Sequence, residues 1–169
     1  MVHSIELLFD PDTEATLRGL WDALAQAGIP SQAPAGRPHV TLAAADRIAE
    51  KADATLRPLT ERLPLPCTVG ASLLLGRSNA ILARLIVPTA ELLDFHAAVH
   101  RLCGEHLAPA PAPTSLPGQW TPHVTLARRV GGPALSRALR IAGRPPLVEG
   151  SFAGLRHWNG EKKVDYLIR

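Results

Sequence analysis

One six-residue stretch, PHVTLA, occurs twice in this chain, at residues 38–43 and again at 122–127. In a chain of 169 residues, an identical hexamer arises by chance with a probability of roughly one in a hundred or less. An internal duplication explains the repeat, and a duplicated chain folds as two similar units that share a core. The repeat therefore restricts the architecture more than any other feature of the sequence.

Strand and helix patterns alternate around the first copy. β-branched and apolar residues predict a strand over 2–9, and apolar residues at helical spacing predict a helix over 10–28, with an Asp or a Thr as its N-cap and Gly28 at its end. The hexamer predicts the next strand, a helical stretch follows over 46–63, and a further strand covers 67–76. The order is β-α-β-α-β.

The second half of the chain repeats this order. A turn signal, RSN at 77–79, separates the halves, and a strand over 80–87 and an amphipathic helix over 89–108 follow. The Pro-rich segment 109–119 predicts a loop, and the second hexamer predicts a strand. The remaining elements are a short helix over 133–142 and two strands over 147–158 and 162–168, joined by the hairpin signal NG.

Because the two hexamers occupy equivalent positions, the sequence predicts one α+β domain over 1–169 with two lobes related by a pseudo-two-fold axis. One lobe comes from about 1–77 and the other from 79–169, each a β-α-β-α-β unit, with one strand added in the second. A helix between successive strands leaves the sheets free to be mostly antiparallel. We therefore expect mostly antiparallel sheets that flank a central cleft.

The hexamer carries polar residues at alternate positions. Side chains in a strand alternate between its faces, so His39 and Thr41 share one face while the intervening apolar residues point into the core. His123 and Thr125 repeat the arrangement. Two such strands near a pseudo-two-fold axis would bring two imidazoles and two hydroxyls around one small volume.

Two imidazoles that face each other suit a reaction in which one proton is removed and another is delivered. Imidazole titrates near neutral pH and can do either task. On a phosphodiester, one histidine would activate the attacking water or hydroxyl and the other would protonate the departing oxygen, while the threonines donate hydrogen bonds to phosphate oxygens. Such a site needs no metal.

The segments HVTL at 39–42 and HVTLAR at 123–128 resemble the paired His-x-Thr-x signature of the 2H phosphoesterase superfamily, within it the bacterial 2'-5' RNA ligase-like proteins and RNA 2',3'-cyclic phosphodiesterases. The order of elements extends the resemblance over nearly the whole chain. The resemblance implies metal-independent opening of cyclic phosphates or cleavage of phosphodiesters, without a cofactor. It also implies that His123 is the catalytic base and His39 the acid, and that Thr41 and Thr125 bind phosphate.

Three further residues are candidates for ligand contacts. Arg128 matches the arginine that commonly follows the second motif of the family, but in a regular strand it is out of phase with His123, whereas Arg129 is in phase; a bulge would change this. Trp120, three residues before His123, is available to stack on a base. Relatives often carry bulky residues and a glycine where this chain has alanines at 43–45, so we expect a more open ligand side in the first lobe.

Charge is distributed unevenly along the chain. Residues 1–119 carry nine Lys/Arg and twelve Asp/Glu, a net charge of −3, whereas residues 120–169 carry nine and three, a net charge of +6. This basic part suits a phosphate-bearing ligand, such as an RNA end or a small nucleotide with a cyclic phosphate. With two cysteines, no signal-peptide pattern and no membrane-length apolar run, we expect a cytoplasmic protein without a membrane or an obligate protein partner.

Two alternative functions remain open. One is a 2'-5' RNA ligase or a 2'-5' linkage-specific phosphodiesterase, since the same histidines can catalyse either direction; the other is a nucleotide- or RNA-binding module without turnover. His96, His100 and Cys103 have a spacing that suits a metal, but without a second ligand cluster we expect a buried or half-buried helix face. His157, close to a hairpin, is expected at the surface.

Overall fold

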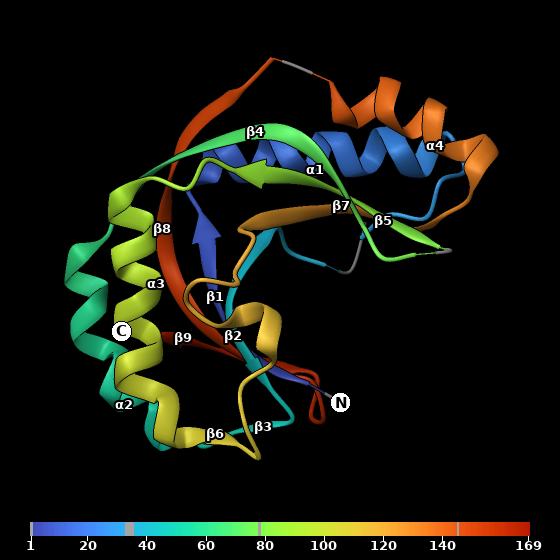
Figure 1. Cartoon of the computed structure of the whole chain (residues 1–169). Helices are drawn as coiled ribbons and strands as arrows, with labels where there is room; N and C mark the ends of the chain where they lie inside the picture. The colour runs from blue at the N-terminus through green and yellow to red at the C-terminus, as the bar shows by residue number, and fades with distance from the viewer. Residues whose placement is uncertain (1, 33–35, 78, 145) are drawn as a thin grey trace.

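The structure, a computed structural model, describes residues 2–32, 36–77, 79–144 and 146–169 (Figure 1). Helices pack on antiparallel strands, which confirms the predicted α+β class. Residue 78, within the turn predicted at 77–79, lies outside the described residues. None of the helices in the described part of the chain combines the length and the apolar character needed to cross a membrane.

Seven strands of the described chain form one antiparallel sheet: β1 (His3–Phe9), β2 (His39–Ala45), β4 (Leu65–Leu75), β5 (Ala80–Ile86), β7 (His123–Val130), β8 (Val148–Asn159) and β9 (Val164–Ile168). Their order is β2-β1-β8-β4-β5-β7, and β9 pairs with β8 beside this path. The two copies of the hexamer therefore lie in the strands at opposite ends of the path.

The pairing exchanges strands between the two halves of the chain. In the first half, β1 pairs with β2 and takes β8, from the end of the chain, as its other neighbour. In the second half, β5 pairs with β7 and takes β4 as its other neighbour. The long strand β8 also pairs with β4 and so joins the two sets into one sheet. The lobe boundary at 77–79 stays a prediction.

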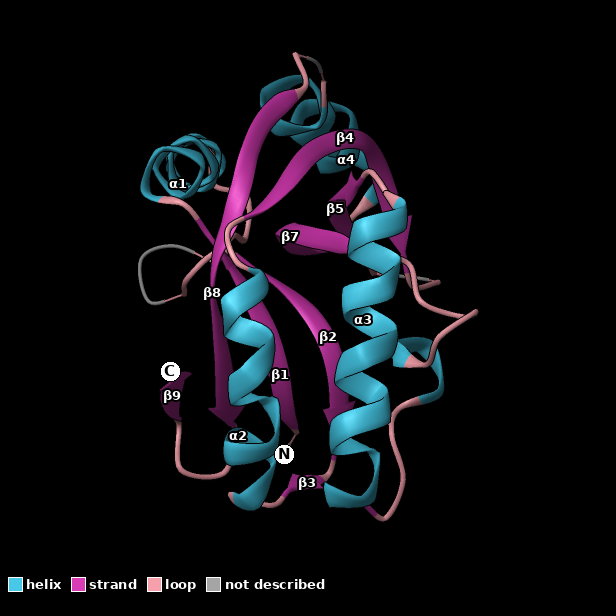
Figure 2. Cartoon of the chain, turned by 90° about the vertical axis from the view of Figure 1, so that its left-hand side faces the viewer, coloured by secondary structure: helices cyan, strands magenta, loops and turns pink. Residues whose placement is uncertain are grey.

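Four α-helices are present among the described residues: α1 (Pro11–Gln26), α2 (Lys51–Leu56), α3 (Ala90–Cys103) and α4 (Gly132–Ala138). α2 continues as a 3-10 helix over Arg57–Arg62, and α4 continues as a π-helical turn over Leu139–Gly143. α2 and α3 lie side by side over one part of the sheet, and α3 contacts β2 (Figure 2). α1 contacts β7 and the π-helical turn at the other part.

The first helix is fixed by its N-cap. The Asp10 carboxylate accepts hydrogen bonds from the Thr13 N–H at 2.9 Å and the Thr13 hydroxyl at 2.6 Å, and Pro11 takes the first helical position. The same carboxylate accepts from the Ser151 N–H at 2.7 Å, which ties α1 to β8. These bonds, the Thr13 hydroxyl foremost, lower the pKa of Asp10 to about 2. At Gly150 any side chain would collide with the Thr13 hydroxyl, so this approach requires glycine.

The buried apolar side chains form two clusters, one that includes α2 and α3 and one that includes α1 and α4. The larger cluster packs Leu56, Phe95 and Val99 of α2 and α3 against Ile5 of β1 and Val40 of β2. The smaller cluster contains a different set, from α1, β5, β7 and the region of α4: Trp21, Leu24, Leu82, Leu126, Ala138 and Ala142. Each hexamer strand thus has its own core, to which helices from both halves of the chain contribute: α2 and α3 beside β2, and α1 and α4 beside β7.

Two short elements were missed by the sequence analysis. β3 (Arg47–Ile48) and β6 (Leu107–Ala108) pair with each other as a separate two-stranded sheet, where the sequence predicts helix over 46–63 and 89–108. β6 follows a 3-10 turn over Gly104–His106, and a further 3-10 turn covers Pro113–Ser115. Two-residue strands carry no periodicity, so no sequence pattern marks them.

Candidate active site

The two hexamer strands present the same faces, as alternation predicts. Val40 and Leu42 are fully buried, and so are Val124 and Leu126. The histidine and threonine of each motif are half-buried on the opposite face. Cα atoms of β2 and β7 approach within 8 Å of each other, although the two strands end opposite sides of the sheet path (Figure 1). The sheet therefore curls until its two ends lie close together.

Both motifs contain a β-bulge at the same residue. In the first motif Ile5 pairs with Ala43 and Glu6 with Thr41, so Leu42 has no partner in this register. In the second, Leu82 pairs with Ala127 and Ala83 with Thr125, so Leu126 has no partner in its register. A bulge shifts the alternation by one residue. The alanine after each bulge accordingly turns into the core, where it is fully buried.

The bulge changes where the two predicted arginines point. Arg128 is exposed and lines the same cavity as His39, because the shift returns it to the cleft side of the strand. Arg129 adopts a φ of +55° at a further irregularity of the β5–β7 pairing and is absent from the cavity walls. The bulge that the sequence analysis left open is present, so the phase expected for a regular strand does not apply to the two arginines.

Each motif histidine is held by the same backbone contact. Nδ1 of His39 lies 2.8 Å from the carbonyl oxygen of Arg37, and Nδ1 of His123 lies 2.7 Å from that of Thr121. A carbonyl can only accept, so Nδ1 of both rings is the protonated nitrogen. Nε2 is left in each case as the nitrogen that can accept or deliver a proton.

An indole ring fixes the backbone of each motif threonine. Nε1 of Trp120 donates to the Thr41 carbonyl at 2.9 Å, and Nε1 of Trp21 donates to the Thr125 carbonyl at 3.0 Å. Both strands lie at the ends of the sheet path, with a paired strand on one side only. The two bonds thus satisfy polar groups that a sheet edge would otherwise leave open.

Two adjoining cavities open along the histidine faces. One of about 790 Å³ is lined by His39, and one of about 380 Å³ by His123. Thr41 and Ala44 belong to the walls of both, so the two cavities meet there. Beyond these residues the larger cavity is mainly polar, with Ser4, Glu6, Arg37, Arg128, Arg156 and Asp165. The smaller one has Leu75, Gly76, Ala112 and Trp120 in its wall.

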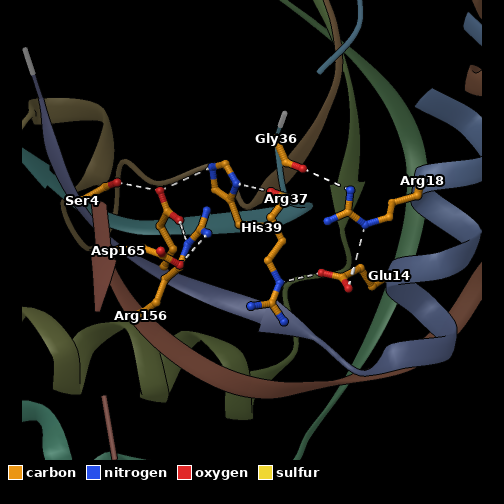
Figure 3. A network of polar contacts seen from close by, with 9 residues as sticks. Ser4, Glu14, Arg18, Gly36, Arg37, His39, Arg156 and Asp165 are labelled. Carbon is orange, nitrogen blue, oxygen red and sulfur yellow. Dashed lines mark hydrogen bonds and ion pairs between the residues drawn. The ribbon is translucent and has the colours of Figure 1, made fainter. Parts of the chain in front are cut away.

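A network of charged groups lies beside His39 and has no counterpart in the sequence analysis. Oε1 of Glu6 is 3.5 Å from Nε2 of His39, and Oε2 of Glu6 is 2.6 Å from Nε of Arg156 (Figure 3). The Ser4 hydroxyl donates to Oε1 of Glu6 at 2.6 Å, and Arg156 also contacts Asp165 at 3.3 Å. The signal for Ser4 and Glu6 was their alternation within an apolar strand, which places both on one face.

Trp120 is a supporting residue in this structure as well as part of a cavity wall. Its ring stacks on that of His96, with centroids 3.8 Å apart and planes 4° from parallel. His96 donates from Nε2 to the Ser115 carbonyl at 2.8 Å, and His100 donates from Nε2 to the Leu42 carbonyl at 2.9 Å. Burial, with the nearby His100 second, lowers the pKa of His96 to about 4.

The candidate metal ligands on α3 serve this packing instead. Cys103 is fully buried, and burial raises the pKa of its thiol to about 11. Over residues 2–32, 36–77, 79–144 and 146–169, no three His, Cys, Asp or Glu side chains converge as a metal site. The predicted surface position of His157 is wrong, since it is 1% exposed and its Nδ1 lies 2.8 Å from Asp53 of α2.

Comparisons with known proteins agree with this geometry. A profile of the 2'-5' RNA ligase superfamily matches residues 10–159. Comparison with curated protein sequences gave no match. Among solved structures, the chain is similar to TT0787 of Thermus thermophilus, with 17% identity and a TM-score of 0.62, over 100% of this chain and 96% of that one.

Two structures of E. coli LigT are also similar. The apo form has 11% identity and a TM-score of 0.59, over 99% of this chain and 94% of that one. The form complexed with 3'-AMP has 13% identity and a TM-score of 0.54, over 98% and 91%. Identities this low show the fold alone. The profile match, however, spans most of the chain and both His-x-Thr strands, and the chain therefore belongs to the 2'-5' RNA ligase superfamily of 2H phosphoesterases.

Proposed function

We propose that this chain is a metal-independent phosphodiesterase that opens 2',3'-cyclic phosphates, on RNA ends or on small nucleotides, with His39 and His123 as its acid/base pair. The proposal goes beyond family membership in naming the substrate class, the reaction and the residues. It rests on one observation above all. Two imidazoles, each with Nδ1 tied to its own backbone, lie at adjoining cavities that meet at Thr41.

In the proposed reaction, Nε2 of His123 removes a proton from water while the water oxygen bonds to phosphorus. Nε2–H of His39 gives its proton to the ribose 3'-oxygen as the P–O3' bond breaks. The products are a 2'-phosphate and a 3'-hydroxyl, and the proton on His123 returns to His39 through solvent. The family resemblance supports this assignment of base and acid, which the similarity of the two motifs alone does not decide.

The phosphate would lie between the two motifs. Thr41 and Thr125 are half-buried on the same faces as the histidines, so their hydroxyls can donate to the non-bridging phosphate oxygens. Arg128 would supply positive charge from the larger cavity, and Trp120 an aromatic edge in the smaller one. Arg129 would contact only a ligand that extends beyond the cavities. The LigT structure with 3'-AMP supports a nucleotide as ligand.

The relation between the halves is part of the proposal. From one end the sheet path begins β2-β1-β8, and from the other it begins β7-β5-β4. In each case a hexamer strand comes first, and the first strand of the same half of the chain comes next. The bulges and the histidine contacts also correspond between the two motifs. These correspondences support a duplication that produced two lobes about a pseudo-two-fold axis, with the cleft between them.

Two alternatives share the same site. The ligase direction, or cleavage of a 2'-5' linkage, needs the same two histidines with a ribose hydroxyl in place of water. A binding module without turnover needs neither imidazole to transfer a proton. The geometry favours an enzyme, because both Nε2 atoms are left available for proton transfer by the Nδ1 contacts.

The direct test is product analysis in EDTA with 2',3'-cyclic nucleotides and with a short RNA that ends in a 2',3'-cyclic phosphate. We expect a 2'-phosphate product from at least one of them, at a rate that EDTA does not reduce. Binding without product would favour the module, and a joined 2'-5' RNA product would favour the ligase. Activity that requires an added metal would contradict the mechanism.

A further inference from the structure

We propose that Glu6 is a positioning residue that makes His39, rather than His123, the proton donor. The inference rests on the proposed function and explains a choice that the two equivalent motifs leave open. Both histidines follow a proline, precede the same four residues, and bind a backbone carbonyl two residues earlier through Nδ1. Any difference in their chemistry therefore has to come from neighbours outside the hexamers.

The contact of Glu6 with His39 is attractive in one protonation state only. Nδ1 of His39 already donates to the Arg37 carbonyl, so in the neutral ring Nε2 carries a lone pair. Oε1 of Glu6 lies 3.5 Å from that nitrogen. A carboxylate repels a lone pair and accepts a hydrogen bond from an N–H, so Glu6 can orient the ring while Nε2 carries its proton. That proton is the one the departing 3'-oxygen needs.

The carboxylate of Glu6 is held where it can act in this way. It is 3% exposed, and its two oxygens are occupied by the Ser4 hydroxyl and by Nε of Arg156, each at 2.6 Å (Figure 3). Arg156 is itself steadied by Asp165. These hydrogen bonds and the buried ion pair restrict rotation of the Glu6 carboxylate, so Oε1 stays directed at His39.

The second motif lacks this carboxylate at the corresponding position. Glu6 pairs with Thr41 across the first bulge, and Ala83 pairs with Thr125 across the second. Ala83 is fully buried and offers His123 no charge. Within the described part of the chain, no carboxylate forms an ion pair with His123, so its Nε2 remains suited to accept a proton. The two motifs therefore differ at one equivalent position, which is Glu6 in the first and Ala83 in the second. In this proposal, that difference makes His39 the acid and His123 the base.

The experiment compares two substrates that differ only in what they require from an acid. One is a nucleoside 2',3'-cyclic phosphate, and the other carries sulfur in place of the bridging 3'-oxygen. A thiolate leaves without a proton, so the second substrate needs no acid. We expect Glu6→Gln to lower kcat on the oxygen substrate about tenfold or more, as a share of the roughly 10²–10⁴ that general-acid catalysis supplies. On the sulfur substrate we expect wild-type kcat.

Glu14→Gln is the matched control. Glu14 is also paired with an arginine at 2.6 Å, Arg37, but it does not contact His39 (Figure 3). We expect any change in kcat to be the same on both substrates, because Glu14 contacts Arg37, whose carbonyl holds Nδ1 of His39, and does not contact Nε2. If Glu6→Gln fails to fold because Arg156 loses its buried partner, Glu6→Gln with Arg156→Gln removes both charges and serves instead.

Each outcome is decisive for Glu6. An equal loss on both substrates would assign it a structural role and overturn the inference, as would wild-type kcat on the oxygen substrate. A rise in KM alone would place Glu6 in binding and overturn it too. If the wild-type protein opened neither substrate, the proposed function would fail, and this outcome is distinct from any effect of the variant.

Discussion

β2 and β7 carry the same six residues and share much of their local geometry, yet they lie in different surroundings. Each has a bulge after its threonine, a histidine bound to its own backbone, and an indole on its threonine carbonyl. Beside His39 there is a buried carboxylate and a polar cavity; beside His123 there is an alanine and a smaller cavity with Trp120 in its wall. We infer that a repeated strand sequence sets the geometry of each proposed catalytic group and that its non-local neighbours set its task.

The largest expected effect comes from removing either member of the pair. His39→Ala and His123→Ala should each lower kcat/KM on a cyclic phosphate by about 10²–10⁴, since each removes one proton-transfer group. Both side chains are half-buried and outside the apolar clusters, so the fold should persist. Kinetics with a thermal melt of each variant checks both statements. Turnover near the wild-type level in either variant would contradict the two-histidine mechanism.

Adjacent arginines give the next comparison. Arg128→Gln should raise KM for a cyclic nucleotide by about tenfold, the order expected for one charged hydrogen bond. Arg129→Gln should leave KM unchanged for a small nucleotide, because its side chain does not reach the cavity walls. Steady-state kinetics of both variants tests the bulge directly. A larger effect of Arg129→Gln than of Arg128→Gln would mean that the strand is regular in solution, and equal effects would contradict the separate placement of the two side chains.

Acidic pH should destabilise the packing around β2 more than the packing around β7. His96 stacks on Trp120, which holds Thr41, and its pKa lies at about 4 in the folded chain against about 6.5 unfolded. Between these values only the unfolded chain binds the proton, so the stability present above pH 6.5 is lost as the pH falls towards 4, by at most about 1.4 kcal/mol per pH unit.

Denaturant unfolding across this range, with wild type and His96→Gln, measures the effect. Gln can keep a hydrogen bond to the Ser115 carbonyl but does not titrate, so the variant should show a flatter dependence of unfolding free energy on pH. The same slope in both proteins would remove His96 from the explanation.

The indole contacts should give the smallest change. Trp120→Phe and Trp21→Phe each remove one hydrogen bond to a threonine carbonyl, worth about 1 kcal/mol of stability. Trp21 is 2% exposed within the core, whereas Trp120 lines the smaller cavity, so only Trp120→Phe should also alter KM. Urea unfolding and kinetics of the two variants separate the effects; a change of KM in Trp21→Phe would argue against this division.

Much of the fold was predictable because its elements have strong periodicity. The strand and helix order, the α+β class and the inward face of each hexamer follow from residue spacing alone. The exchange of β4 and β8 between the halves was not predictable, because local patterns do not state which strands pair. The short pair β3–β6 lacks any repeat that a window could detect.

The residues of the candidate site also fall into those that the sequence could predict and those that it could not. His39, His123 and both threonines could be identified since they recur within a repeated motif. Glu6 and Arg156 are 150 positions apart, and their contact depends on the antiparallel pairing of β1 with β8. The position of Arg128 depended on a bulge, which sequence alternation cannot place. Prediction therefore failed where a residue's role depends on a distant strand or a local irregularity.

The most direct test of unequal roles for equal motifs is to assay His39→Ala and His123→Ala on the cyclic phosphate with a bridging 3'-oxygen and on its 3'-sulfur analogue. Both variants should be inactive on the oxygen substrate. On the sulfur substrate His39→Ala should recover most of its activity, since a thiolate needs no acid, while His123→Ala should stay inactive for want of a base. Recovery of His123→Ala instead, or of both variants to the same degree, would contradict the account.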